Sequence, residues 1–253
     1  MKFLLRISLL PLMLLIMMGP AEAQIIKKPR INLKKEGQKV FKKVFGEEEE
    51  ENTSSDRDNS GNNSRQKGKM LEPPKVADNL DEASYSLDEG NYGESRYYVQ
   101  QAMMGIELEI GKKILEDLPE EIMGIPYDPD QDELYSNGAF FTGLAIGRVY
   151  YSKAKEVKVS IVNNSALINT YSMALASSQG YNGEEGTYKT VRVQGNKAYL
   201  QYNPDSGDYG LGIPIGQSTV IVLDFEGFAD EGEVMTATDA IPVEQIKNDL
   251  GEQ

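Results

Sequence analysis

The sequence predicts an α+β fold in which an antiparallel sheet carries helices on one side and follows a helical hairpin and a disordered N-terminal tether. The sheet is indicated by residues 147–178, where Val157, Val159 and Ile161 alternate with polar residues, as in a strand with one buried face. The hairpin is indicated by apolar residues at spacings of three and four within residues 76–118. The tether is indicated by polar, charged sequence that cannot bury enough apolar surface to fold.

Residues 1–23 have the pattern of a secretory signal peptide. Lys2 and Arg6 supply positive charge, residues 7–18 are apolar, and Ala21-Glu22-Ala23 matches a cleavage site. Because the apolar run is short for a bilayer span, an uncleaved anchor is the less favoured alternative. The next residue is Gln24, and the chain has no Cys to carry a lipid. We therefore expect an exported soluble protein, periplasmic or extracellular, that is not a lipoprotein.

Residues 24–45 are strongly basic, with eight Lys or Arg against one Glu, a net charge of +7. On a helical wheel Leu33, Val40 and Val44 share one face, which predicts a basic amphipathic helix on an anionic membrane surface or an acidic partner. The alternative is a solvated tail that touches the acidic body of the same protein. The residues expected to make the membrane or partner contact are Lys34, Lys35, Lys39, Val40, Phe41, Lys42, Lys43 and Phe45.

The basic segment is followed by an acidic and polar one. Residues 47–51 are five consecutive Glu, and the sequence up to residue 69 is rich in Asn, Ser and charged residues. Residues 24–75 as a whole are therefore predicted to be a disordered, basic-then-acidic linker.

Residues 76–118 are predicted to form a helical hairpin. Val76, Leu80, Ala83 and Leu87 mark the apolar side of the first helix, and Gly90 suits a left-handed end. The second helix has glycines at 105 and 111, which suggest close approach by another element. Its apolar stripe consists of Val99, Met103, Ile106, Ile110 and Ile114.

This hairpin resembles a single tetratricopeptide unit. Ala83, Gly90, Tyr92 and Ala102 stand at the family's small, Gly, Tyr and small positions, whereas Ser95 replaces the usual Ala and the closing Pro is missing. The resemblance implies a helix–turn–helix, but one unit cannot build the peptide-binding groove of an array. We expect the hairpin to cap the following domain or to pair with a copy of itself.

Residues 119–139 are predicted to be an acidic connector. The alternation of Asp128, Asp130 and Asp132 invites the alternative of a calcium loop, which requires Gly at its sixth position and Glu at its twelfth. Those positions hold Glu133 and Ala139, so a solvated connector is the default.

Residues 140–253 are predicted to be the α/β domain. Its strands are expected at residues 144–151, 157–161, 187–193, 197–202, 210–215 and 218–225, with helices at 165–178 and after Pro242. Residues 219–225 are apolar at both odd and even positions, which predicts a central strand covered on both faces.

The order of these elements, with residues 147–165 (GRVYYSKAKEVKVSIVNNS), resembles exported bacterial proteins that carry a PsbP-like α/β domain. The resemblance covers residues 140–253 and includes no catalytic motif. It implies a binding or assembly role.

The composition removes common kinds of chemistry. The chain has no His and no Cys, and therefore lacks the usual general base near neutral pH and the usual zinc ligands. Gly216-Gln217-Ser218 is the nearest fragment to a serine-nucleophile motif and lies in a predicted turn. We expect no catalytic residue, no cofactor and no metal site. Residues 70–253 carry 12 basic and 31 acidic residues, a charge that repels nucleic acid.

The resulting hypothesis is an exported, non-enzymatic binding or assembly module. Its expected partners are proteins, with peripheral membrane contact through residues 24–45 and no nucleic acid. One alternative is a His-free hydrolase that uses a carboxylate pair in a cleft between hairpin and sheet. The other is a calcium-dependent adhesion protein that binds through the connector.

Overall fold

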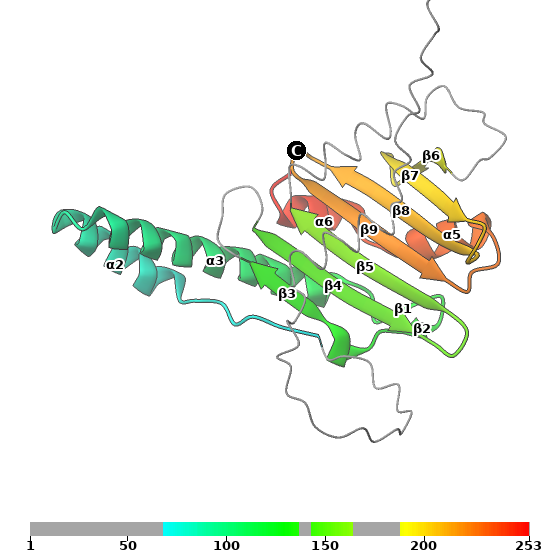
Figure 1. The fold of residues 1–253 in the computed structure, drawn as a ribbon, viewed down its shortest axis with the longest axis horizontal. Coiled ribbons are helices and arrows are strands. Elements are labelled where there is room, and N and C mark those ends of the chain that lie inside the picture. Colours follow the sequence, from blue (N-terminus) through cyan, green and yellow to red (C-terminus); the bar gives the residue numbers. More distant parts are fainter. Residues whose placement is uncertain (1–67, 137–142, 164–187, 253) are drawn as a thin grey trace, which may run out of the picture. The chain divides into compact units, whose positions relative to one another are not determined.

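Among the residues that the structure describes, the sheet contains seven strands, in the order β3-β4-β5-β9-β8-β7-β6, and every neighbouring pair is antiparallel. The computed structural model describes residues 68–136, 143–163 and 188–252 (Figure 1). The strands are β3 (Glu133–Ser136), β4 (Leu144–Tyr151), β5 (Glu156–Asn163), β6 (Tyr188–Val193), β7 (Asn196–Asn203), β8 (Asp208–Ile215) and β9 (Thr219–Glu226).

Strand β9 lies at the centre of the sheet, between β5 and β8, as its sequence predicts. Ile221, Leu223 and Phe225 are buried on one face, and Val220 and Val222 are buried on the other. A strand with apolar residues on both faces gains most free energy at this place, where both faces are removed from water.

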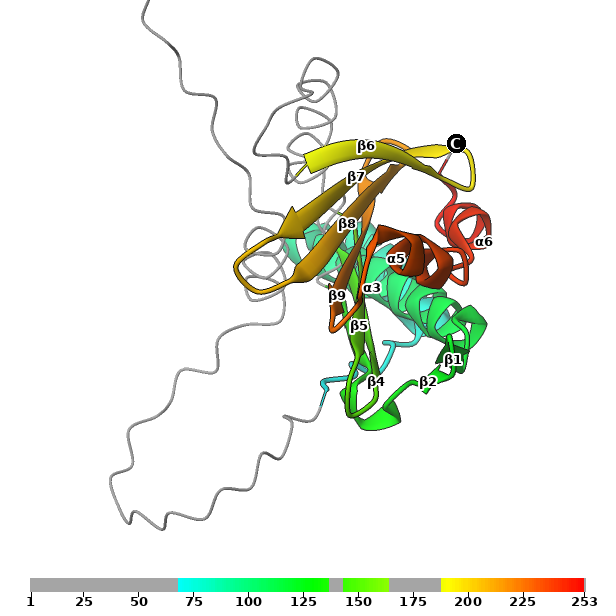
Figure 2. The ribbon, with the colours of Figure 1, turned by 90° about the vertical axis from the view of Figure 1, so that its right-hand side faces the viewer.

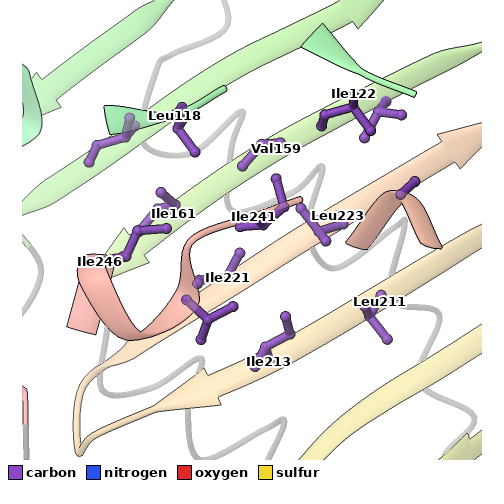
Figure 3. Packing of buried hydrophobic residues seen from close by; sticks show 14 of the residues in the cluster. Leu118, Ile122, Val159, Ile161, Leu211, Ile213, Ile221, Leu223, Ile241 and Ile246 are labelled. Carbon is purple, nitrogen blue, oxygen red and sulfur yellow. The ribbon is translucent and has the colours of Figure 1, made fainter. Parts of the chain in front are cut away.

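Helices pack on one face of the sheet, as the sequence predicts. Figure 2 shows α3 (Tyr92–Asp117), α5 (Glu231–Thr238) and α6 (Val243–Asp249) on the same side. The core between the layers joins alternate strand residues to the helices, and Figure 3 shows strand residues such as Val159, Ile221 and Leu211 together with Ile246 from α6. The pattern of period two in the strands therefore defines the face on which the helices lie.

The predicted helical hairpin is present as α2 (Val76–Asp88) and α3. The second half of α3 joins the core of the sheet from Leu108 onward. Gly111 permits this, because a Cβ atom there would lie 2.2 Å from a methyl carbon of Leu134 on β3. The described residues all belong to one compact unit, Ile31–Gln253.

The acidic connector expected at 119–139 differs from the prediction, because it adds elements to the fold. It contains the short paired strands β1 (Glu121–Ile122) and β2 (Ile125–Pro126), and the 3-10 helix η1 (Pro129–Gln131). It also supplies the edge strand β3, so the sheet begins before residue 140. Leu134 is fully buried in β3. One apolar residue among acidic neighbours is too short a pattern to indicate a strand from the sequence.

The C-terminal part contains one helix more than expected. The predicted last helix is α6, which Pro242 precedes, but α5 was missed because its sequence, EGEVMTAT, has little apolar periodicity. Asp230 caps α5 by accepting a hydrogen bond from the backbone N–H of Glu233 at 2.9 Å. The predicted leader at 1–23, residues 24–67 of the predicted linker and the predicted helix at 165–178 lie outside the described residues. The rest of the predicted linker, residues 68–75, is ordered rather than disordered. The backbone of Leu134 donates to the carbonyl of Lys69 and accepts from the N–H of Leu71, and Leu71 packs against the core.

Candidate interaction surface

The seam between α2 and α3 is built from small residues. Ala83, Ser95, Ala102 and Gly105 are all buried in it. The Ser95 hydroxyl donates a hydrogen bond of 2.8 Å to the backbone carbonyl of Ala83. A Cβ atom on Gly105 would lie 2.4 Å from the carbonyl oxygen of Pro74, immediately before α2. The two helices therefore pack closely, and their large apolar side chains lie outside the seam.

Several of these large side chains lie together on one side of the hairpin. On each helix, these side chains are rotated about the helix axis by about a quarter turn from the side that faces the other helix. The rotation has the same sense on both helices when each is viewed from its own N-terminus. Because α2 and α3 are antiparallel, the same sense of rotation brings both rows to the same side. The bond between Ser95 and Ala83 sets the register, so that Leu80 lies level with Val99 and Leu87 level with Tyr92.

We call this surface the apolar face and define it by Leu80, Leu87, Tyr92, Val99, Met103 and Ile106. Leu80 and Leu87 are 50% and 54% exposed, and Val99 and Ile106 are each 43% exposed. Val99 and Ile106 belong to the apolar stripe that the sequence predicts for the second helix, and the structure leaves this half of the stripe exposed. At its C-terminal end, Ile114 is buried and Ile110 is partly buried against the core.

The surroundings of the apolar face are acidic. Residues 76–106 contain six Asp or Glu and one Arg, a net charge of −5. Asp81 and Asp88 directly follow the two exposed leucines of α2, and both are exposed. An apolar surface bordered by acids suits a partner with apolar and basic side chains.

A second group of buried charged and aromatic side chains, of the kind often found in functional sites, surrounds Arg148 on β4. In this protein its role is structural. The guanidinium binds both carboxylate oxygens of Asp132, at 2.9 and 2.5 Å, and lies 4.1 Å from the ring centre of Tyr127. Burial alone would lower the pKa of Arg148, but the bonds and charge of Asp132 hold it above the ordinary value. Burial also raises the pKa of neighbouring Tyr150 to about 12, and its hydroxyl donates to the carbonyl of Pro119 at 2.8 Å. These contacts fix the end of α3 and the connector against β4.

A third group lies on the opposite face of the sheet, at Lys158 of β5. Burial lowers the pKa of Lys158, while Glu133, Asp224 and Glu156 act in the other direction. Burial likewise raises the pKa of Glu133, against the effect of Lys158. The positive charge of Lys158 and the negative charges of these carboxylates lie on the same or nearby strands. The attraction between them partly offsets the cost of burial, as in a structural ion-pair group.

The carboxylates considered for catalysis or calcium have other partners. Glu107 of α3 accepts a hydrogen bond from Ser136, and burial raises its pKa. Asp128 accepts from the backbone N–H of Asp130 and from the side chain of Gln131, and Asp132 binds Arg148. Within residues 68–136, 143–163 and 188–252, no group of three or more carboxylates is placed to hold a metal ion. Glu184 and Glu185, adjacent acids in the sequence that could in principle serve as a carboxylate pair, lie outside the described residues.

The contact residues predicted in the basic segment also lie outside the described residues. They are Lys34, Lys35, Lys39, Val40, Phe41, Lys42, Lys43 and Phe45. In the part of the chain that the structure describes, no helix is long and apolar enough to cross a membrane.

The apolar face was missed by reasoning from sequence, although a signal for it exists. Ser95 and Ala102 are seven residues apart, and Ala83 occupies the facing helix, so a row of small residues marks a close seam. A close seam excludes the larger side chains beside it. The sequence contains no comparable signal for the ion pair of Arg148 with Asp132. Only the fold brings these two side chains together.

Comparisons with known proteins leave the family open. A scan against protein-family models found no match, and a search of the curated proteins found none. Among solved structures, the chain is similar to the extracellular domain of PknH from Mycobacterium tuberculosis, with 10% sequence identity and a TM-score of 0.28. The match covers 43% of this chain and 66% of that one, so the chain spans just under two thirds of the solved domain. A TM-score this low does not establish a shared fold or function.

Proposed function

We propose that the protein is an exported, non-enzymatic binding or assembly module that uses the apolar face to bind an amphipathic helical segment of a protein partner. The observation that carries this proposal is the exposure of Leu80, Leu87, Val99 and Ile106 together on one side of the hairpin. Single exposed apolar residues are common, but a contiguous row on two paired helices is typical of an interaction site.

The nature of the partner follows from the shape and charge of the face. Two antiparallel helices with a close seam offer a surface along which a third helix can lie, with apolar side chains at every third or fourth position. The exposed acids Asp81 and Asp88 favour basic residues at the edges of that helix. The leader pattern at residues 1–23 supports export, and the resemblance to PsbP-like proteins supports a binding or assembly role by analogy.

Site-specific photo-crosslinking tests this proposal on the whole chain. A photoreactive phenylalanine analogue at Leu80 should cross-link to a discrete partner in the native envelope fraction, whereas the same analogue at Tyr85 should not. Tyr85 is 64% exposed but lies on the other side of the hairpin, and it is therefore a matched control. Cross-linking of equal strength from both positions would contradict a specific face.

Substitution provides the second arm of the test. Leu87→Glu should reduce the Leu80 cross-link at least about ten-fold, because a charge is buried in the contact. It should change the free energy of unfolding by no more than about 0.5 kcal/mol, since Leu87 is exposed. Tyr85→Glu should leave both quantities unchanged. An undiminished cross-link in folded Leu87→Glu protein would overturn the proposal.

A further inference from the structure

We propose that the basic amphipathic segment of this same chain, residues 33–45, docks on the apolar face of the hairpin. The inference rests on the proposed function, because it names a resident occupant of the same surface. An external partner must then displace this segment, so that binding is regulated from within the chain.

Charge favours this occupant over a second copy of the hairpin. The hairpin residues 76–106 carry a net charge of −5, and residues 24–45 carry +7. Two hairpins placed face to face would bring −5 against −5, with the exposed Asp81 and Asp88 of each copy at the contact. Such an arrangement is disfavoured by repulsion between like charges, whereas the basic segment neutralises the same acids.

The apolar pattern and the length also agree. Leu33, Val40 and Val44 share one side of a helical wheel, flanked by Phe41 and Phe45. Thirteen residues of helix extend about 20 Å, and the apolar face from Tyr92 to Ile106 extends about 21 Å along α3. The segment can therefore cover the whole face without leaving a large part of either surface in water.

The chain between the two partners is long enough. Residues 46–67 provide 22 residues between the segment and the first described residue, Gly68. Fully extended, they reach about 70–80 Å, whereas α3 with its 26 residues is about 39 Å long. A tether of this length keeps the segment at an effective concentration on the order of millimolar, which favours docking within one chain.

Disulfide trapping in the whole chain tests the docking directly, because the natural sequence has no Cys. The test variant carries Val40→Cys with Leu80→Cys, and the matched control carries Val40→Cys with Tyr85→Cys. Under mild oxidation the test pair should form an intramolecular disulfide at least about ten times faster than the control pair. Adding Lys39→Glu, Lys42→Glu and Lys43→Glu should remove most of this difference, because the charge attraction is lost.

Three outcomes would overturn the inference. Equal rates for the two pairs would show that the segment has no preference for the face. Disulfides mainly between chains, at rates that rise with protein concentration, would assign the face to a second copy. Equal rates together with sedimentation of the chain on anionic vesicles would assign the segment to a membrane surface.

The two proposals fail separately. If the analogue at Leu80 cross-links to a foreign protein while the test and control pairs oxidise at equal rates, the apolar face is a binding site without a resident segment. If the test pair oxidises faster than the control pair and no foreign protein is ever cross-linked, the face serves the chain itself and the proposed function is wrong.

Discussion

The side chain of Arg148 contacts two earlier parts of the chain, the connector and the end of α3. It binds the carboxylate of Asp132 in the connector, lies over the ring of Tyr127, and donates to the carbonyl of Leu118 after α3 at 3.4 Å. The side chains of Arg148 and Asp132 are only 6% and 13% exposed. In such a site, removal of one partner leaves a buried charge without compensation.

We therefore predict that Arg148→Met lowers the free energy of unfolding by about 3–5 kcal/mol, measured by urea denaturation. The matched control is Arg192→Met on β6, where the arginine is exposed and the expected change is within about 0.5 kcal/mol. Combining Arg148→Met with Asp132→Leu should recover much of the loss, since no buried charge then remains. A single variant Arg148→Met as stable as Arg192→Met would contradict the structural role.

Glu252 closes the turn between β8 and β9. Burial alone would raise its pKa, but hydrogen bonds from the backbone N–H of Gln217 and the hydroxyls of Ser218 and Thr219 outweigh burial and lower it. A folded-state pKa below the ordinary value of 4.5 means that the charged form stabilises the fold above that pH. The stabilisation is lost as the pH falls through the lowered pKa.

For this reason Glu252→Gln should reduce the free energy of unfolding at neutral pH by at most about 1 kcal/mol, because the site is partly open to solvent. The difference from the natural chain should shrink as the pH falls below the ordinary carboxyl pKa of 4.5 and through the lowered pKa of Glu252. Thermal melts of both proteins at a series of pH values measure this difference in stability. A difference that stays constant with pH would show that the carboxylate charge is not the cause.

At the scale of elements, the hairpin shows how small residues determine what stays exposed. Ser95 and Gly105 allow α3 to approach α2 closely, and the larger side chains of both helices then have no place in the seam. In an ordinary helical pair the apolar stripe fills the interface, but here Val99 and Ile106 of the predicted stripe are exposed. Periodicity gives the side of a helix on which apolar residues lie, but not which neighbour covers that side.

Alanine substitutions at two glycines of α3 distinguish the effect of close helix packing on stability from the effect of helix propensity. Gly105→Ala should lower the free energy of unfolding by about 1–3 kcal/mol, because the new methyl group would meet the backbone of Pro74. Gly93→Ala should be neutral or stabilise the protein by up to about 1 kcal/mol, since no atom lies within 4 Å of its added Cβ. Urea denaturation of both variants compares them. Equal gains in stability would exclude a close seam at Gly105.

At the scale of the whole molecule, the charge distribution and the strand order have different origins. The basic segment at 24–45 and the acidic remainder can be read from the sequence without any structure. The central place of β9 could also be predicted, because a strand with apolar residues at both odd and even positions requires cover on both faces. The edge strand β3 could not, because four residues with two polar side chains resemble a loop until β4 pairs with them.

The sequence by itself determined the α+β class, the helical hairpin, most of the strands and the absence of His and Cys, since these depend on local periodicity and composition. The tertiary structure alone decided which apolar residues remain in water, which carboxylates are already bound, and how Arg148 joins the connector to the sheet. The physical reason is that burial and ion pairing depend on neighbours that are distant along the chain. A close seam between two helices is therefore what left Leu80 and Val99 exposed to solvent.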